Sequence, residues 1–122
     1  MNLIALLPTE IKLHQQSKSL ELIYADKSRY QLPYEYLRVY SPSAEVRGHG
    51  QGEMQLVVGK QHVGVKRVEP VGHYAIKIFF DDEHSSGLYT WEMLYELATH
   101  YQEYWQNYLK RLKSAGLSRN AY

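Results

Sequence analysis

Hydrophobic and polar residues alternate along several short stretches of the chain, as they do in β-strands that bury one face. The clearest alternation runs over residues 73–80 and places on one face Tyr74, Ile76, Ile78 and Phe80. Weaker alternation predicts further strands over residues 10–16, 20–25, 29–32, 54–58 and 63–68. Leu88 and Tyr89 add a short return strand at most.

A period of three and four residues replaces this alternation in the C-terminal part of the chain. The apolar stripe consists of Trp91, Leu94, Ala98, Tyr101, Trp105, Tyr108 and Leu112. It predicts one continuous helix from Thr90 to Lys113, with the Thr90 hydroxyl as N-cap and Gly116 as the stop. A short helix is predicted over residues 34–40, because Pro33 suits a first helical turn.

These elements predict an α+β fold in one domain of 122 residues. We expect a mainly antiparallel sheet of about five or six strands, with the long C-terminal helix packed on one face and the short helix near residues 34–40 at an edge. The ordered core should span about residues 10–113, and residues 117–122 should form a frayed tail.

Composition narrows the classes of protein to consider. The net charge of +1 argues against a nucleic-acid binder, and the absence of cysteine excludes disulfides and thiolate metal sites. No apolar run approaches the ~20 residues that span a bilayer, and the start of the chain lacks the basic region of a signal peptide. A cytoplasmic location, in a bacterium, is the default expectation.

Residues 41–52, SPSAEVRGHGQG, form the one long irregular stretch. Loops of this length are uncommon unless they have a role or are disordered. We expect a flexible or partner-binding loop, with candidate contact residues for a protein partner at Ser41, Pro42, Ser43, Glu45, Arg47 and His49. A phosphate-binding loop is disfavoured because the glycines match neither nucleotide-binding pattern. A basic surface is a weaker alternative, from Arg38, Arg47, Lys60, Lys66 and Arg67.

The acidic stretch 81–87, DDEHSSG, predicts a loop after the 73–80 strand. A divalent metal, zinc or iron, is one hypothesis for this loop, with the candidate ligands His84, Asp81, Asp82, His49 and His73. The alternative is a solvated loop. Asp81 and Asp82 do not suggest an acid–base pair, because adjacent strand-end residues point in opposite directions.

Two motifs together carry a resemblance to a known family: LR-x-x-SPSAEVRGHG, from Leu37 to Gly50, and VGHYAIKIFFDDEHSSGLYTWEMLYEL, from Val71 to Leu97. The chain resembles the small domain of unknown function also found at the N-terminus of gamma-butyrobetaine hydroxylases. The resemblance implies an α+β domain that stands alone in many bacteria. It also implies relatives fused to 2-oxoglutarate oxygenases or to P-loop iron–sulfur carrier ATPases.

In the hydroxylase branch the resemblance implies a structural zinc bound by three cysteines and one histidine. The three cysteine positions match Ser41, Ser43 and Val46 here. Of the four zinc ligands only the histidine is retained, as His84. Because one imidazole does not hold zinc, the cysteine zinc site of the family is absent. His73 and Glu83 replace the asparagine and glycine usual in the family, which adds potential ligands beside His84.

Catalytic chemistry finds little support in the sequence. No histidine has an acid two residues on, as the oxygenase ligand pair requires, and no P-loop is present. We therefore expect a non-catalytic binding or adaptor module with a protein partner, linked through the fused relatives to iron–sulfur or metalloenzyme assembly. The alternatives are a small metal-binding domain centred on His84 and the acidic loop, and an enzyme of unknown reaction.

Overall fold

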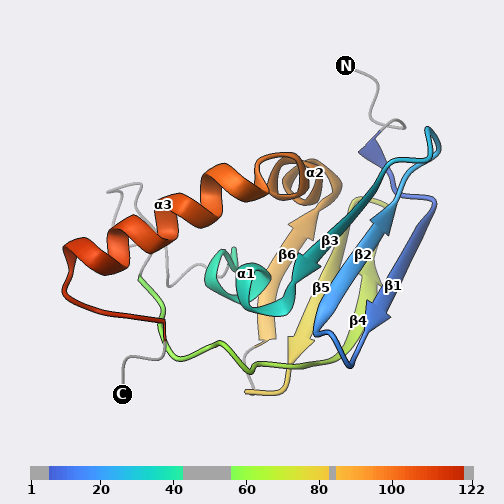
Figure 1. The fold of residues 1–122 in the computed structure, drawn as a ribbon. Coiled ribbons are helices and arrows are strands. Elements are labelled where there is room, and N and C mark those ends of the chain that lie inside the picture. The colour runs from blue at the N-terminus through green and yellow to red at the C-terminus, as the bar shows by residue number, and fades with distance from the viewer. Residues whose placement is uncertain (1–5, 43–55, 83–84, 120–122) are drawn as a thin grey trace.

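The computed structural model describes residues 6–42, 56–82 and 85–119, without the side chains of 85–87 (Figure 1). Within these ranges, nine elements follow one another along the chain. They are β1 (Glu10–His14), β2 (Ser19–Ile23), β3 (Arg29–Pro33), α1 (Tyr34–Val39), β4 (Val65–Val71), β5 (Ala75–Phe80), β6 (Ser85–Thr90), α2 (Trp91–Thr99) and α3 (Tyr101–Ser114). The α+β class, the antiparallel strands and the C-terminal helical region are confirmed.

The strands form two three-stranded antiparallel sheets, β1-β2-β3 and β4-β5-β6, where the sequence predicted a single sheet. Residues 56–58, predicted as part of a strand, are irregular. By contrast, β6 begins at Ser85, so the return strand is longer than predicted and the acidic loop is shorter. β5 starts at Ala75, which leaves Tyr74 in the preceding turn with 51% of its surface exposed rather than in the core.

The inner faces of the two sheets enclose the main core. In the first sheet Leu20 lies opposite Leu13 and Leu32, and these three side chains share one face. In the second sheet the alternation read from the sequence buries Ile76, Ile78 and Phe80, and β6 adds Tyr89. Leu94, Leu97 and Ala98 of α2 belong to the same cluster. The period-2 pattern of β5 is thus explained by burial of one face.

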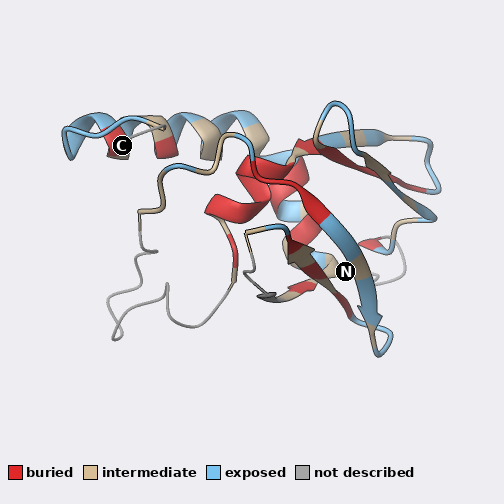
Figure 2. Ribbon diagram, turned by 90° about the horizontal axis from the view of Figure 1, so that it is seen from below, coloured by how far each residue is buried: buried red, intermediate tan, exposed pale blue. Residues whose placement is uncertain are grey.

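Helix α1 is buried at all six of its residues, as Figure 2 shows. A helix this short is unstable alone in water, so its surroundings must hold it. Pro33 precedes its first turn with φ −58° and ψ 144°, an extended geometry that fits proline. Tyr36 extends from α1 to α2 and donates its hydroxyl to the Leu97 carbonyl at 2.7 Å. Tyr89 of β6 donates to the Leu37 carbonyl of α1, also at 2.7 Å.

The single long helix predicted from Thr90 to Lys113 is divided at His100, where φ is −112° and ψ is 23°. The Thr99 hydroxyl donates back to the Tyr95 carbonyl at 2.9 Å, and His100 Nδ1 lies 3.1 Å from the Glu96 carbonyl. Side chains that bond to the backbone of the preceding turn bend or end helices. The N-cap prediction is confirmed, since the Thr90 hydroxyl accepts a hydrogen bond from the Met93 amide at 3.1 Å.

Helix α3 ends in a turn that directs the chain back toward α1. The Leu117 amide donates to the Leu112 carbonyl at 2.8 Å and the Gly116 amide to the Lys113 carbonyl at 3.0 Å, which together form a Schellman motif. Gly116 has φ +72°, as this motif requires, and confirms the predicted stop. Of the tail predicted to fray, residues 117–119 are described, and Arg119 pairs with Glu35 of α1; residues 120–122 lie outside the described residues.

Replacing Tyr89 by phenylalanine should lower the free energy of unfolding by about 1 to 2 kcal/mol, because it leaves the buried Leu37 carbonyl without its hydroxyl donor. Urea denaturation followed by circular dichroism measures this change. Tyr74→Phe, at a side chain 51% exposed, is the matched control and should be near neutral. Equal stability of the two variants would contradict the role assigned to the Tyr89 hydroxyl.

Candidate functional site

Asp81, the first residue of the predicted acidic loop, is held by backbone groups of the segment before β4. Its carboxylate accepts a hydrogen bond from the Gly64 amide at 2.9 Å, and its own amide donates to the Gly64 carbonyl at 2.8 Å. A Cβ at position 64 would lie 2.6 Å from Asp81 Oδ2, so glycine is needed for this approach. Asp81 therefore fastens the end of β5 to the segment before β4.

Asp82 points to a different set of partners, as expected for adjacent residues at a strand end. Its Oδ2 accepts hydrogen bonds from Arg38 Nε at 3.0 Å and from Lys60 Nζ at 2.7 Å. The three side chains are 20%, 11% and 23% exposed respectively, so this is a partly buried cluster. It joins α1, the segment before β4 and the end of β5. The alternative of a solvated acidic loop does not hold for Asp82.

The predicted metal ligands are not brought together in the part of the chain that the structure describes. His84 and His49 lie outside the described residues. His73 is exposed in the turn before β5, where its carbonyl accepts a hydrogen bond from the Trp91 indole at 2.8 Å. Among described residues, no three histidine or acidic side chains gather as a metal site would require. Metal binding at His84 stays a prediction.

Of the predicted partner-binding loop, the described residues are Ser41 and Pro42. Ser41 is buried, with 1% of its surface exposed, and its amide donates to the Arg38 carbonyl at 3.3 Å. Ser41 is therefore not a surface contact residue, because the chain is still packed against the core just after α1. Ser43, Glu45, Arg47 and His49 lie outside the described residues.

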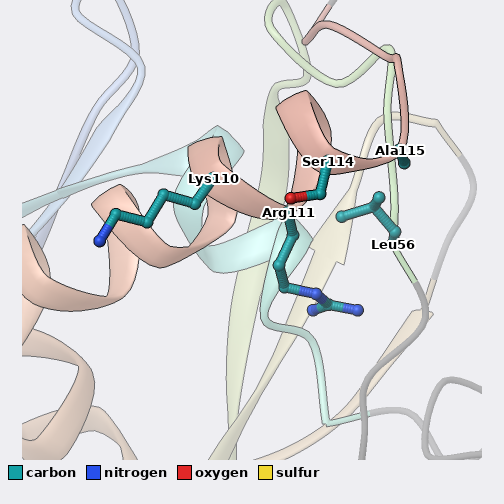
Figure 3. Close-up of a pocket in the computed structure, with 5 residues that line it drawn as sticks. All are labelled: Leu56, Lys110, Arg111, Ser114 and Ala115. Atoms are coloured by element: carbon teal, nitrogen blue, oxygen red, sulfur yellow. The ribbon is translucent and has the colours of Figure 1, made fainter.

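A shallow hollow of about 340 Å³ lies at the end of α3, as shown in Figure 3. Its lining residues are Leu56, Lys110, Arg111, Ser114 and Ala115. In this view the Arg111 side chain lies on the side of Leu56, whereas Lys110 points away from it. The hollow is open and brings no nucleophile, base and acid together, so it does not resemble an active site.

The outer face of the β1-β2-β3 sheet carries charges that pair with one another. Glu21 is central, with a side chain 7% exposed, and its two carboxylate oxygens lie 2.8 Å from His14 Nε2 and 3.2 Å from Arg29 Nη1. Lys12 lies 3.8 Å from Glu10 on the same face. The hydrogen bond from His14 is the main cause that lowers the pKa of the Glu21 carboxyl, and Arg29 adds to it.

The outer face of the β4-β5-β6 sheet has a different character, because an aromatic ring lies among its charges. Phe79 is half-buried and lies directly opposite Arg67, whose guanidinium carbon is 3.9 Å from the centre of the ring. The Lys77 ammonium lies 5.4 Å from the same centre. Glu69, opposite Lys77, pairs with Arg67 at 2.7 Å, with the two side chains 51% and 54% exposed.

Local patterns predict only part of this surface. The alternation of β5 correctly places Lys77 and Phe79 on the face opposite to the core. The register of β4 was not predictable, because the pairing with β5 shifts between Val65 and Arg67. That irregularity determines which β4 side chain lies opposite Phe79.

Comparisons with known proteins agree with this fold. A family model described as gamma-butyrobetaine hydroxylase-like, N-terminal matches residues 11–95. The chain belongs to this family. The resemblance read from the two sequence motifs is thus confirmed. Among curated proteins no match was found.

Solved structures also match the family domain. One solution NMR structure is 52% identical, with a TM-score of 0.81 over 95% of this chain and 91% of the other. A second is 46% identical, with a TM-score of 0.79 over 93% and 86%. A crystal structure from Acidithiobacillus ferrooxidans, 39% identical, has a TM-score of 0.65 over 77% of this chain and 94% of the other. It is described as a protein of unknown function of the DUF971 family.

None of the described helices has the length and apolar character needed to cross a membrane. The matched family is one of unknown function to which no reaction is assigned. Function must therefore be argued from the surfaces of the domain.

Replacing Asp82 by asparagine should lower the free energy of unfolding by about 1 to 3 kcal/mol, because Arg38 and Lys60 would lose the anion they share in a partly buried cluster. Chemical denaturation measures the change. Glu10→Gln, in an exposed pair, is the control and should be near neutral. An Asp82→Asn variant as stable as the control would refute the cluster's structural role.

Acidification should selectively weaken the outer face of the β1-β2-β3 sheet. Folding lowers the pKa of the Glu21 carboxyl from 4.5. The ionised carboxylate therefore contributes its full stabilisation above pH 4.5, and this stabilisation is lost as the pH falls through the lowered pKa. Glu21→Gln should therefore show a smaller loss of stability across this acidic range than the wild type, measured by urea unfolding at several pH values. Glu69→Gln, in an exposed pair, should follow the wild type. Identical pH profiles for Glu21→Gln and the wild type would contradict this assignment.

Proposed function

We propose that this domain is a non-catalytic module that binds a protein partner through the outer face of the β4-β5-β6 sheet. The observation that carries the proposal is the position of Phe79, a half-buried ring between Arg67 and Lys77 on a face with exposed charges. Aromatic residues and arginine are enriched in protein interfaces and dominate their binding energy.

Charge complementarity favours an acidic protein surface as the partner. Strands β4 and β5 together contain three cations, Lys66, Arg67 and Lys77, and one anion, Glu69. An acidic partner with an apolar side chain would cover Phe79 while its carboxylates meet the cations. The other sheet is less suited to an acidic partner, because the central charged side chain of its outer face is an acid, Glu21, which already pairs with His14 and Arg29.

An adaptor function linked to iron–sulfur or metalloenzyme assembly is the finer form of this proposal. Its support is the resemblance to domains fused to carrier ATPases, and no feature of the described residues bears on it. The proposal of a binding module does not depend on that link.

The test combines site-specific crosslinking with affinity measurements on purified proteins. A photo-crosslinking residue at position 79 should capture a partner that the same residue at position 12, on the outer face of the other sheet, does not. Once purified, that partner should bind the wild type and should bind Arg67→Glu/Lys77→Glu at least about tenfold more weakly, because opposite charges become like charges.

The control is Lys12→Glu/Lys27→Glu, which changes the net charge equally at two exposed positions away from β4 and β5. It should keep wild-type affinity. Equal affinity for both double variants, or equal loss in both, would overturn the proposed surface. Circular dichroism of each variant establishes that its fold is retained before the affinities are compared.

A further inference from the structure

Glu35 is a charged side chain whose burial requires a partner. It lies in the first turn of α1, and its side chain is only 7% exposed. A buried carboxylate without a cation is strongly disfavoured, because the protein interior replaces little of the hydration that it loses. The fold therefore holds a site that demands a positive charge at this point.

Arg119 occupies this site with the geometry specific to a guanidinium. Its Nε and Nη2 donate to the two oxygens of Glu35 at 2.9 and 2.6 Å, a bidentate arrangement that lysine cannot make. The guanidinium carbon also lies 5.4 Å from the centre of a Trp105 ring of α3. Carboxylate and ring thus recognise both the charge and the planar shape of the group.

The two partners differ in how deeply they lie. Whereas Glu35 is part of the buried helix α1, Arg119 is 40% exposed and belongs to the C-terminal segment, defined here as residues 115–119. This segment is largely at the surface, with Leu117 43% exposed. A backbone hydrogen bond from the Gly59 amide to the Arg119 carbonyl, at 2.6 Å, adds to the anchorage at the same residue.

We propose that Glu35 and Trp105 form an arginine-binding site that Arg119 fills in the free chain and that an arginine of a protein partner fills in a complex. The C-terminal segment acts as an intramolecular competitor for this site. Glu35 lies within the residues matched by the family model, whereas Trp105 and Arg119 follow them. These residues lie on other elements than the β4-β5-β6 face, so each of the two proposals can be refuted without the other.

The first experiment opens the site and offers it a defined probe. The chain has two tryptophans, so a Trp91→Phe background leaves Trp105 as the sole indole fluorophore. In that background Arg119→Ala should bind N-acetyl-L-arginine amide with a saturable change in fluorescence, half-complete on the order of millimolar. N-acetyl-L-lysine amide should bind at least about tenfold more weakly, since it cannot form the bidentate pair.

The matched control is Glu35→Gln/Arg119→Ala, in which the arginine probe should produce no saturable change. Binding that survives this control, or equal binding of the arginine and lysine probes, would overturn the site. A folded Arg119→Ala variant that does not respond to the arginine probe would likewise overturn it, since Arg119 would then serve only as a structural ion pair.

The second experiment uses the wild-type chain and does not depend on any variant folding. The Gly59 amide reports on the C-terminal segment, because it donates to the Arg119 carbonyl. An arginine-bearing peptide should lower the hydrogen-exchange protection of this amide in a saturable way. Tethered Arg119 competes, so more peptide is needed than for the open site. Unchanged protection at peptide concentrations about ten times the millimolar value expected for the open site would overturn exchange at the site.

Discussion

Buried carbonyl groups at the ends of short helices impose a constraint that the fold meets with tyrosine hydroxyls. The last carbonyls of a helix have no amide partner within it and must find another donor. Tyr36 supplies one to Leu97 near the end of α2, and Tyr89 supplies one to Leu37 near the end of α1. These bonds link α1 to α2 and β6 to α1, so segments distant in sequence are joined at α1. Burial raises the pKa of Tyr36, as expected for a hydroxyl that is used as a neutral donor within the core.

Helix α1 also carries two charged side chains that hold distant parts of the chain in place, the C-terminal segment and the end of β5. Glu35 holds Arg119 of the C-terminal segment, and Arg38 holds Asp82 at the end of β5. The Glu35 and Arg38 side chains are both largely buried, and each pairs with a residue far away in sequence. Such pairs add little net stability compared with apolar packing, but losing one partner is costly. They therefore fix where the C-terminal segment and the end of β5 can lie, and so position the arginine-binding site that we propose.

Local patterns predicted the elements well because burial of one face leaves a period in the sequence. β5 and the stripe of α2 and α3 were recognised in this way, and the Thr90 cap and Gly116 stop followed from local chemistry. Features that depend on pairing between distant residues were not predictable. The division of six strands into two sheets, the shift in register beside Arg67 and the return of Arg119 to Glu35 leave no local signal.

The break at His100 was missed because the apolar stripe continues across it, while side-chain bonds to the preceding turn end the helix. Of the predicted site residues, Ser41 proved buried and Asp82 proved paired, and both outcomes depend on where α1 packs.

Helix α1 is the element on which the rest of the structure depends, and native-state hydrogen exchange tests this most directly. The Tyr40 amide, which donates to the Tyr36 carbonyl at 3.1 Å, reports on the opening of the helix. A six-residue helix held only by its own hydrogen bonds would open locally at little free-energy cost. We predict instead that this amide exchanges only through global unfolding, with an opening free energy equal to that of the amides in β2 and β5. Exchange through a local opening, at a free energy well below that of the strands, would contradict the central role of α1.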